Sequence, residues 1–324
     1  MRTSKMIILA VLSLLFLVAC NATIAGTAPV CNAALFIDHV IVDVPVELGS
    51  TLMPGVEFTK TWRLQNEGTC TWDEGYALVL LEGDSIGAPD EISLGSAVAS
   101  GESLDISVTM AAPETPGTYS GEWMLRNAEG EFFGVGADNQ KPLLAEIVVP
   151  ELPEGVVYDF NQMVCMAEWH SGLAEFLPCE GDPQDDGDIR IGYVYLAEDA
   201  ALEHRTANTQ PSIVVKPNNQ PGGWIAGFFP AAPIQAGDEF VATIGCLDHN
   251  PDCSLLFHLD YELPDGRAGS LSSFPEEFNE IASEIRVDLS ELAGEQPRLI
   301  LRVEEAGGRS LQAIGFWLDA QVIR

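Results

Sequence analysis

Basic residues are scarce in this chain of 324 residues, which carries 15 lysines and arginines against 49 aspartates and glutamates. The formal net charge of -34 would repel a phosphate backbone, which argues against a nucleic-acid partner. The acidic residues are spread along a chain that is 47% hydrophobic. This pattern indicates folded domains with an acidic surface rather than a disordered acidic tail.

Local catalytic motifs are also scarce. The chain has no His-Glu-x-x-His zinc motif and no Glu-x-Asp-x-x-Glu block of the jelly-roll glycanases. The segment Gly83-Asp84-Ser85-Ile86 is similar to the nucleophile block of one esterase family. That chemistry needs a histidine base placed by an acid on an α/β scaffold, whereas the only histidine of residues 31–150, His39, falls in an expected strand. We therefore expect a non-enzymatic protein and assign no catalytic residue.

The N-terminus has the three parts of an export signal. Arg2 and Lys5 precede an apolar run from Met6 to Val18, which is too short for a comfortable membrane span. The run closes on Leu-Val-Ala-Cys, which resembles a bacterial lipobox. We predict a lipoprotein signal peptide at residues 1–20, lipidation of Cys20, a tether at residues 21–30, and an extracytoplasmic chain anchored to the envelope or cell surface. The alternative is an ordinary secretory signal with an incidental cysteine.

Six cysteines remain once Cys20 is set aside, and an even number in an exported chain predicts disulfides. Pairing within domains would join Cys31 to Cys70. In the second half the simplest pairs are Cys165 with Cys179 and Cys246 with Cys253, although four cysteines allow three connectivities. No Cys-x-x-Cys spacing supports a zinc site.

Residues 31–150 show the alternation of antiparallel strands. Phe58, Trp62 and Leu64 share one face of a strand, and Leu104 to Met110 alternate apolar with polar residues. Pro116-Gly117-Thr118-Tyr119 opens another strand, in a pattern that suggests a tyrosine corner. No helix is needed, so we expect a β-sandwich.

Several motifs in this domain occur in a recognisable order. They are Phe58-Thr-Lys-Thr-Trp62-Arg-Leu, Asn66-Glu-Gly-Thr-Cys-Thr-Trp72, Pro116-Gly-Thr-Tyr119 and Gly121-Glu-Trp123-Met-Leu. Together they resemble the four-tryptophan immunoglobulin-like domain of the next-to-breast-cancer-gene-one autophagy receptor family, which also occurs in bacterial exported proteins. The resemblance implies an Ig-like sandwich and a bias toward protein or peptide binding. Three tryptophans match, and Trp62 and Trp123 are expected to be core residues.

Residues 151–155 form an expected linker to a second domain at residues 156–324. Pro150 and Pro153 favour an extended, stiff chain here. About eight strand signals follow, among them Ile189 to Leu196, with one short helical turn at Ser290 to Ala293. We predict a jelly-roll-like sandwich, and the closing residues resemble galactose-binding-like carbohydrate-binding modules. The whole chain is thus expected to be all-β.

Three features of this domain are candidates for binding. Trp224 follows Pro-Gly-Gly and is either an exposed ring that stacks on sugars or a core residue. Trp169 and His170 are a further candidate pair, with a lone surface histidine as the alternative. Asp182, Gln184, Asp186 and Asp188 place oxygen atoms around a glycine turn, as a calcium loop does. A solvated acidic loop without metal is the alternative there, and no other cofactor is expected.

The resulting hypothesis is a surface-anchored lipoprotein built from protein- or glycan-binding β-sandwich modules. An extracytoplasmic carbohydrate-active hydrolase and a purely structural acidic stalk remain the alternatives.

Overall fold

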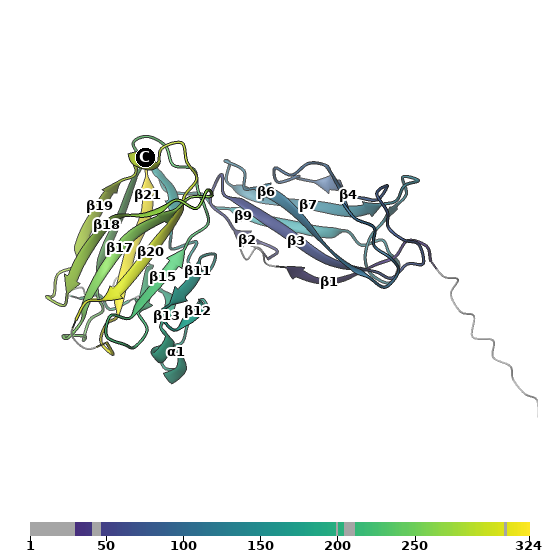
Figure 1. The fold of residues 1–324 in the computed structure, drawn as a ribbon. Helices are drawn as coiled ribbons and strands as arrows, with labels where there is room; N and C mark the ends of the chain where they lie inside the picture. Colours follow the sequence, from purple (N-terminus) through teal and green to yellow (C-terminus); the bar gives the residue numbers. More distant parts are fainter. Residues whose placement is uncertain (1–29, 41–46, 199, 204–210, 308–309) are drawn as a thin grey trace, which may run out of the picture.

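The computed structural model describes residues 30–40, 47–198, 200–203, 211–307 and 310–324. Within these ranges, the helices are too short or too polar to cross a bilayer. The expected signal peptide, Cys20 and most of the tether lie outside the described residues. The regular secondary structure of the described residues is almost entirely β-strand, arranged as two β-rich domains (Figure 1). The all-β expectation is therefore confirmed.

The first domain is a sandwich of two sheets. The smaller sheet has the order β1-β3-β6, with β1 (Ala34–Val40), β3 (Glu57–Asn66) and β6 (Ser103–Ala111). The larger has the order β2-β9-β7-β4-β5, and β8 pairs with β7 at its side. Its strands are β2 (Ser50–Thr51), β4 (Ala77–Gly83), β5 (Glu91–Ser93), β7 (Gly117–Arg126), β8 (Phe132–Phe133) and β9 (Leu143–Val149).

Tryptophans from both sheets fill this sandwich. Trp62 on β3 and Trp123 on β7 are fully buried, with ring centroids 6.4 Å apart. Trp72 is fully buried as well and packs against Phe133. Such large apolar side chains contribute most of the burial energy of a sandwich core. The three tryptophans are therefore core residues and not a ligand platform.

Two separate positions in the first sandwich are fastened, one by a side chain and one by a disulfide. The hydroxyl of Tyr119 donates a hydrogen bond of 2.7 Å to the carbonyl oxygen of Thr115, which is the geometry of a tyrosine corner. Cys31 and Cys70 form a disulfide that fixes the start of β1 to the turn after β3. The expected tyrosine corner and the expected Cys31–Cys70 pair are therefore both present.

The second domain is a larger sandwich of two sheets, each with six strands. One sheet has the order β13-β14-β21-β16-β19, with β10 paired to β21. Its strands are β10 (Val156–Asp159), β13 (Tyr193–Ala197), β14 (Ser212–Lys216), β16 (Glu239–Cys246), β19 (Ser283–Asp288) and β21 (Gly315–Ile323). Neighbouring strands in this sheet run antiparallel.

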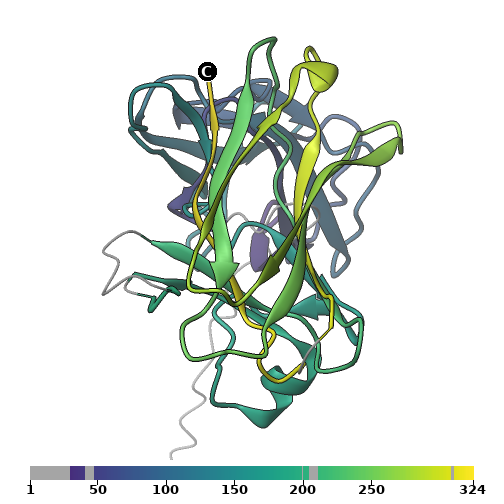
Figure 2. The same cartoon turned by 90° about the vertical axis from the view of Figure 1, so that its left-hand side faces the viewer.

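The facing sheet has the order β12-β11-β15-β20-β17-β18 and is also antiparallel. Its strands are β11 (Glu168–Ser171), β12 (Ala174–Leu177), β15 (Trp224–Phe228), β17 (Ser254–Glu262), β18 (Ala268–Glu277) and β20 (Arg298–Glu305). Figure 2 looks onto this second domain, with the first domain behind it. Two sheets with non-sequential strand order match the jelly-roll-like expectation.

Disulfides close two loops of the second domain. Cys165 pairs with Cys179, and Cys246 pairs with Cys253. The structure therefore contains the simplest of the three connectivities that the sequence allowed.

A helix, α1 (Asp186–Ile191), replaces the start of the strand that was expected from Ile189 to Leu196. The carboxylate of Asp185 accepts hydrogen bonds from the backbone N–H groups of Gly187 and Asp188, which caps the helix. Gly192, with φ of 100°, ends it. Local capping chemistry overrode the apolar alternation that had suggested a strand. A short 3-10 helix at Ser290–Leu292 occupies the place of the expected helical turn.

The two sandwiches touch beside the linker between β9 and β10. A side chain at Gly55, in the first domain, would lie 3.4 Å from the ring of Pro233 in the second. A cleft of about 320 Å³ opens here and is lined by both domains and by Pro150 to Leu152. Gly55 and Pro233 therefore face each other where the domains meet, and the φ of 73° at Gly55 is a backbone conformation that favours glycine.

Candidate functional site

The face of the β12–β18 sheet that points away from the sandwich core gathers polar and aromatic side chains. On β17, Leu255, Phe257 and Leu259 are buried in the core, and His258 and Asp260 alternate onto the opposite face. We call this face, which also carries side chains of β11, β15 and β20, the outer face. Its residues come from segments that are far apart in the sequence.

Strand register aligns these side chains in rows. Cross-strand pairing places His170, Ala226, Arg302, His258 and Ser273 in one row over five strands. With strands about 4.8 Å apart, such a row spans about 19 Å. The outer face is therefore long enough to contact an extended ligand that crosses the strands.

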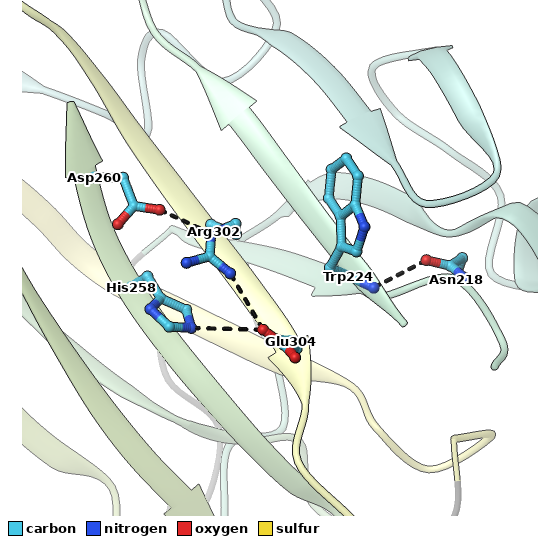
Figure 3. Close-up of polar contacts among 6 residues, drawn as sticks. All are labelled: Asn218, Trp224, His258, Asp260, Arg302 and Glu304. Atoms are coloured by element: carbon cyan, nitrogen blue, oxygen red, sulfur yellow. Dashed lines mark hydrogen bonds and ion pairs between the residues drawn. The ribbon is translucent and has the colours of Figure 1, made fainter. Parts of the chain in front are cut away.

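A guanidinium lies at the centre of the outer face (Figure 3). Arg302 donates from Nε to Asp260 Oδ2 at 2.8 Å and from Nη1 to Glu304 Oε2 at 3.2 Å. We call Arg302, Asp260, Glu304 and the adjacent His258 the Arg302 cluster. One cation and two carboxylates leave this cluster with an excess of negative charge when the imidazole is neutral.

His258 is the most enclosed member of the cluster, with 9% of its surface exposed. Its Nε2 atom lies 3.9 Å from Glu304 Oε2, and the described residues offer this buried nitrogen no hydrogen-bond partner. Burial lowers the pKa of His258, and the charge of Arg302 lowers it further, although Asp260 and Glu304 partly oppose both effects. These surroundings therefore favour the neutral form of the imidazole.

Trp224 begins β15 and is half-buried on the outer face. Its backbone N–H donates to Asn218 Oδ1 at 2.9 Å, and the same oxygen accepts from the Gly172 N–H at 3.1 Å. Asn218 thereby joins the β11–β12 turn to the start of β15 and fixes the backbone that carries the indole (Figure 3). Register places Trp224 next to Glu304 of the Arg302 cluster.

Aromatic rings continue from Trp224 toward the β12 edge. The ring of His170 lies 5.2 Å from that of Phe176 and 5.1 Å from that of Phe228. Arg298 lies over Phe228, at 5.4 Å from the ring centroid, and forms a 3.0 Å ion pair with Glu168. Phe176 is 71% exposed. The outer face thus has an aromatic half, which also holds the Arg298–Glu168 ion pair, and a half occupied by the Arg302 cluster.

The predicted site residues separate on this sheet. Trp224 and His170 lie on the outer face, but Trp169 does not. Trp169 is 1% exposed, and its Nε1 donates to the Val164 carbonyl at 2.8 Å. The suggestion that Trp169 binds ligand is therefore wrong, because strand alternation turns it inward, where it packs over Gly227.

The Arg302 cluster was not predicted from the sequence. None of its four residues was singled out as a candidate. The available signal was charged residues at the outward positions of two strands whose inward positions are apolar. It became specific only through pairing, since β17 and β20 are distant in sequence.

In the acidic loop expected to bind calcium, carboxylates accept hydrogen bonds from the backbone of the loop itself. Asp182 accepts from the Gln184 N–H at 2.7 Å, and Asp188 accepts from the Asp182 N–H at 2.8 Å. Within the described ranges, no group of three acidic, histidine or cysteine side chains is arranged to hold a metal ion. Calcium binding at Asp182, Gln184, Asp186 and Asp188 stays a prediction from sequence.

The esterase-like segment lies in the turn after β4. Gly83 to Gly87 spell the Gly-x-Ser-x-Gly pattern of a nucleophile elbow, but that elbow joins a strand to a helix in an α/β fold. Here the segment joins strands of a sandwich, and His39 lies on β1 in the other sheet. The pattern therefore lacks the scaffold on which its chemistry depends.

Comparison with known sequences identifies the first domain. Residues 45–149 match the family described as the Ig-like domain from next to BRCA1 gene. Protein ILRUN of Danio rerio is 39% identical over 92 residues, which cover 28% of this chain and 32% of that protein. The human Next to BRCA1 gene 1 protein is 32% identical over 104 residues, which cover 32% of this chain and 10% of that protein. The chain thus spans a third or less of these relatives.

Comparison with solved structures gives only distant similarity. A structure of carbohydrate-binding modules from the β-sandwich superfamily aligns over 91% of this chain and 100% of its own, with 12% identity and a TM-score of 0.35. A xylan-binding domain from Paenibacillus barcinonensis aligns over 53% of this chain and 97% of its own, with 9% identity and a TM-score of 0.31.

The family match and the sequence relatives fall on the same sandwich that carries the buried tryptophans and the tyrosine corner. The first domain of this chain is therefore an Ig-like domain of the next-to-BRCA1-gene family.

Proposed function

We propose that this chain is a non-enzymatic extracytoplasmic binding protein whose second sandwich binds a neutral glycan on its outer face. The observation that carries the proposal is the sharing of one sheet face by Trp224, the His170 and Phe176 rings, and the Arg302 cluster. This combination suits a sugar chain, which offers apolar ring faces and many hydroxyl groups.

Each half of the outer face has a role in this proposal. Aromatic side chains present a flat apolar surface with little conformational entropy to lose, so they suit stacking against sugar rings. Carboxylates accept hydrogen bonds from the hydroxyl groups of a sugar, and a guanidinium donates hydrogen bonds to the oxygen atoms of those hydroxyl groups. The negative excess of the cluster, within a chain of net charge -34, disfavours acidic glycans.

The first domain serves as a protein-interaction or spacer module in this proposal. Lipidation of Cys20 would hold both domains at the envelope or cell surface. A Cys20→Ala variant should lose membrane association and appear in the medium or soluble fraction. Retention of the variant at the membrane would contradict the proposed anchor.

Glycan binding can be tested with residues 21–324 by affinity electrophoresis through gels that contain barley β-glucan, carob galactomannan or the acidic polymer polygalacturonate. We expect retardation by a neutral polymer and none by polygalacturonate. Trp224→Ala and Arg302→Met should each weaken binding at least about tenfold, the equivalent of about 1.4 kcal/mol. Phe132→Ala and Arg63→Met, at exposed positions of the first domain, are matched controls that should bind normally.

The same experiment separates the alternatives. Equal binding by Trp224→Ala and the parent chain would remove the outer face as the site. New reducing ends in the incubated polymer would favour the hydrolase, and Asp260 and Glu304, which share one guanidinium, would be its first candidates. Failure of every polymer to retard the chain would favour the acidic stalk.

A further inference from the structure

His258 is a titratable residue that lies beside Glu304, the carboxylate of the Arg302 cluster most accessible to a ligand. Its Nε2 atom is buried and lacks a hydrogen-bond partner among the described residues, and the nearest carboxylate oxygen, Glu304 Oε2, is 3.9 Å away. That separation is beyond a hydrogen bond but within the reach of a side-chain rotation. The Glu304 side chain is 40% exposed, whereas that of Asp260 is 15% exposed.

The charged groups that face His258 come from two strands. Asp260 lies on its own strand, β17, and Arg302 and Glu304 lie on the adjacent β20. On the other side, β18 presents the uncharged Ser273. Along the row, the next titratable group is His170 on β11, three strands away.

Protonation of His258 changes the hydrogen bonds that the Arg302 cluster has to make. A neutral imidazole leaves Glu304 shared between Arg302 and any ligand hydroxyl. An imidazolium adds a buried N–H that must find an acceptor, because an unpaired buried charge is costly. Glu304 is the acceptor within reach, and its turn toward His258 removes it from the ligand. The same proton cancels the negative excess of the cluster.

We infer that glycan binding at the outer face is gated by the protonation of His258, so that affinity falls as the medium becomes acidic. This inference rests on the proposed function and adds its regulation. Linkage requires the reciprocal effect: a bound glycan must make His258 harder to protonate. A release of glycan on acidification is the expected behaviour of the intact chain.

The test is the affinity of residues 21–324 for barley β-glucan and carob galactomannan between pH 7.5 and pH 4.5. Neither polymer titrates in this range. We expect the affinity of the parent chain to fall about tenfold below pH 6.5, the ordinary histidine value. His258→Gln keeps a polar side chain without a titration and should give a flat profile. His249→Gln, at an exposed histidine in the turn between β16 and β17, is the matched control and should retain the fall.

A second readout is the NMR titration of the His258 imidazole. Bound β-glucan should lower the pKa of His258, and Glu304→Gln without polymer should also lower it by removing a stabilising anion. Binding that is flat with pH in the parent chain, or a fall that survives in His258→Gln, would overturn the gate and leave the glycan site intact. Absence of binding at every pH would overturn the proposed function and the gate together.

Discussion

The carboxylate of Asp238 is fully buried and accepts two hydrogen bonds from the guanidinium of Arg324, at 2.8 Å and 3.0 Å. Asp238 precedes β16 and Arg324 follows β21, so the pair fixes the ends of two adjacent strands. The backbone N–H of Gln235 donates a third bond to the same carboxylate at 2.8 Å. A buried charge is tolerated here because its oxygens are paired.

Removal of the guanidinium should therefore destabilise the second domain. We expect Arg324→Met to lower the free energy of unfolding by about 2 kcal/mol, because it leaves a buried carboxylate with one partner. Urea unfolding measures this change. Arg267→Met, which breaks exposed pairs with Asp265 and Glu295, is the matched control and should change stability by less than about 1 kcal/mol. An equal loss in both variants would contradict the role of burial.

The same pair predicts sensitivity to acid. Burial raises the pKa of Asp238, but the hydrogen bonds from Arg324 and Gln235 outweigh it and leave the pKa below its ordinary value. A carboxyl with a lowered pKa in the folded state contributes stability above its unfolded pKa of about 3.9 and loses it as the pH falls further. The stability gap between the parent chain and Asp238→Asn should therefore shrink below about pH 4. A gap that stays constant to pH 2.5 would argue against this assignment.

Lys216 predicts a dependence of the same sign, a stability that rises with pH, but at alkaline pH. The side chain is 1% exposed, and its Nζ donates to the Ser310 carbonyl at 2.7 Å. Burial lowers the pKa of Lys216 to about 8, although Glu305 partly opposes this shift. The unfolded chain keeps its proton to about pH 10.4, so folding becomes more favourable between these values.

Relative to Lys216→Met, the parent chain should gain roughly 3 kcal/mol of stability between pH 7 and pH 10.5. The comparison cancels the titration of tyrosines that both chains share. The exposed Lys141→Met should show no such gain. Unfolding measured across this pH range tests the prediction. An equal dependence of stability on pH in Lys216→Met and Lys141→Met would contradict it.

Glu203 is a buried carboxylate that binds the backbone of β16 and of the loop between β18 and β19. It accepts from the N–H groups of Cys246, Asn279 and Glu280, at 2.9, 3.1 and 3.1 Å. Glu203→Gln places an amide group where an acceptor is required, so we expect a loss of about 2 kcal/mol. Thermal unfolding beside the exposed control Glu284→Gln measures this. A midpoint equal to that of the control would show that the three bonds contribute little.

The disulfides should differ in their contribution according to loop length. The sequence separations are 39, 14 and 7 residues for Cys31–Cys70, Cys165–Cys179 and Cys246–Cys253. Loop-closure entropy predicts losses of about 4, 3 and 2.5 kcal/mol when each pair is replaced by alanines. Denaturant unfolding of the three double variants tests the order, and a reversed order would favour a mainly enthalpic effect.

The outline of both sandwiches was present in local patterns. Alternation around Trp62 and from Leu104 to Met110 is a property of single strands, so it was readable before any pairing was known. The turn before Tyr119 and the close spacing of Cys246 and Cys253 were readable for the same reason. Each is a short-range relationship in which neighbouring residues fix the outcome.

Tertiary structure decided which side chains meet. Trp169 and His170 are adjacent and on opposite faces, and only the position of the facing sheet determined that the tryptophan is inside. His170 and His258 share a row because β15 and β20 lie between their strands, which is a matter of register over long sequence distances. The sequence by itself determined two β-sandwiches with disulfides, whereas pairing between distant strands created the Arg302 cluster, since no local pattern encodes which strands become neighbours.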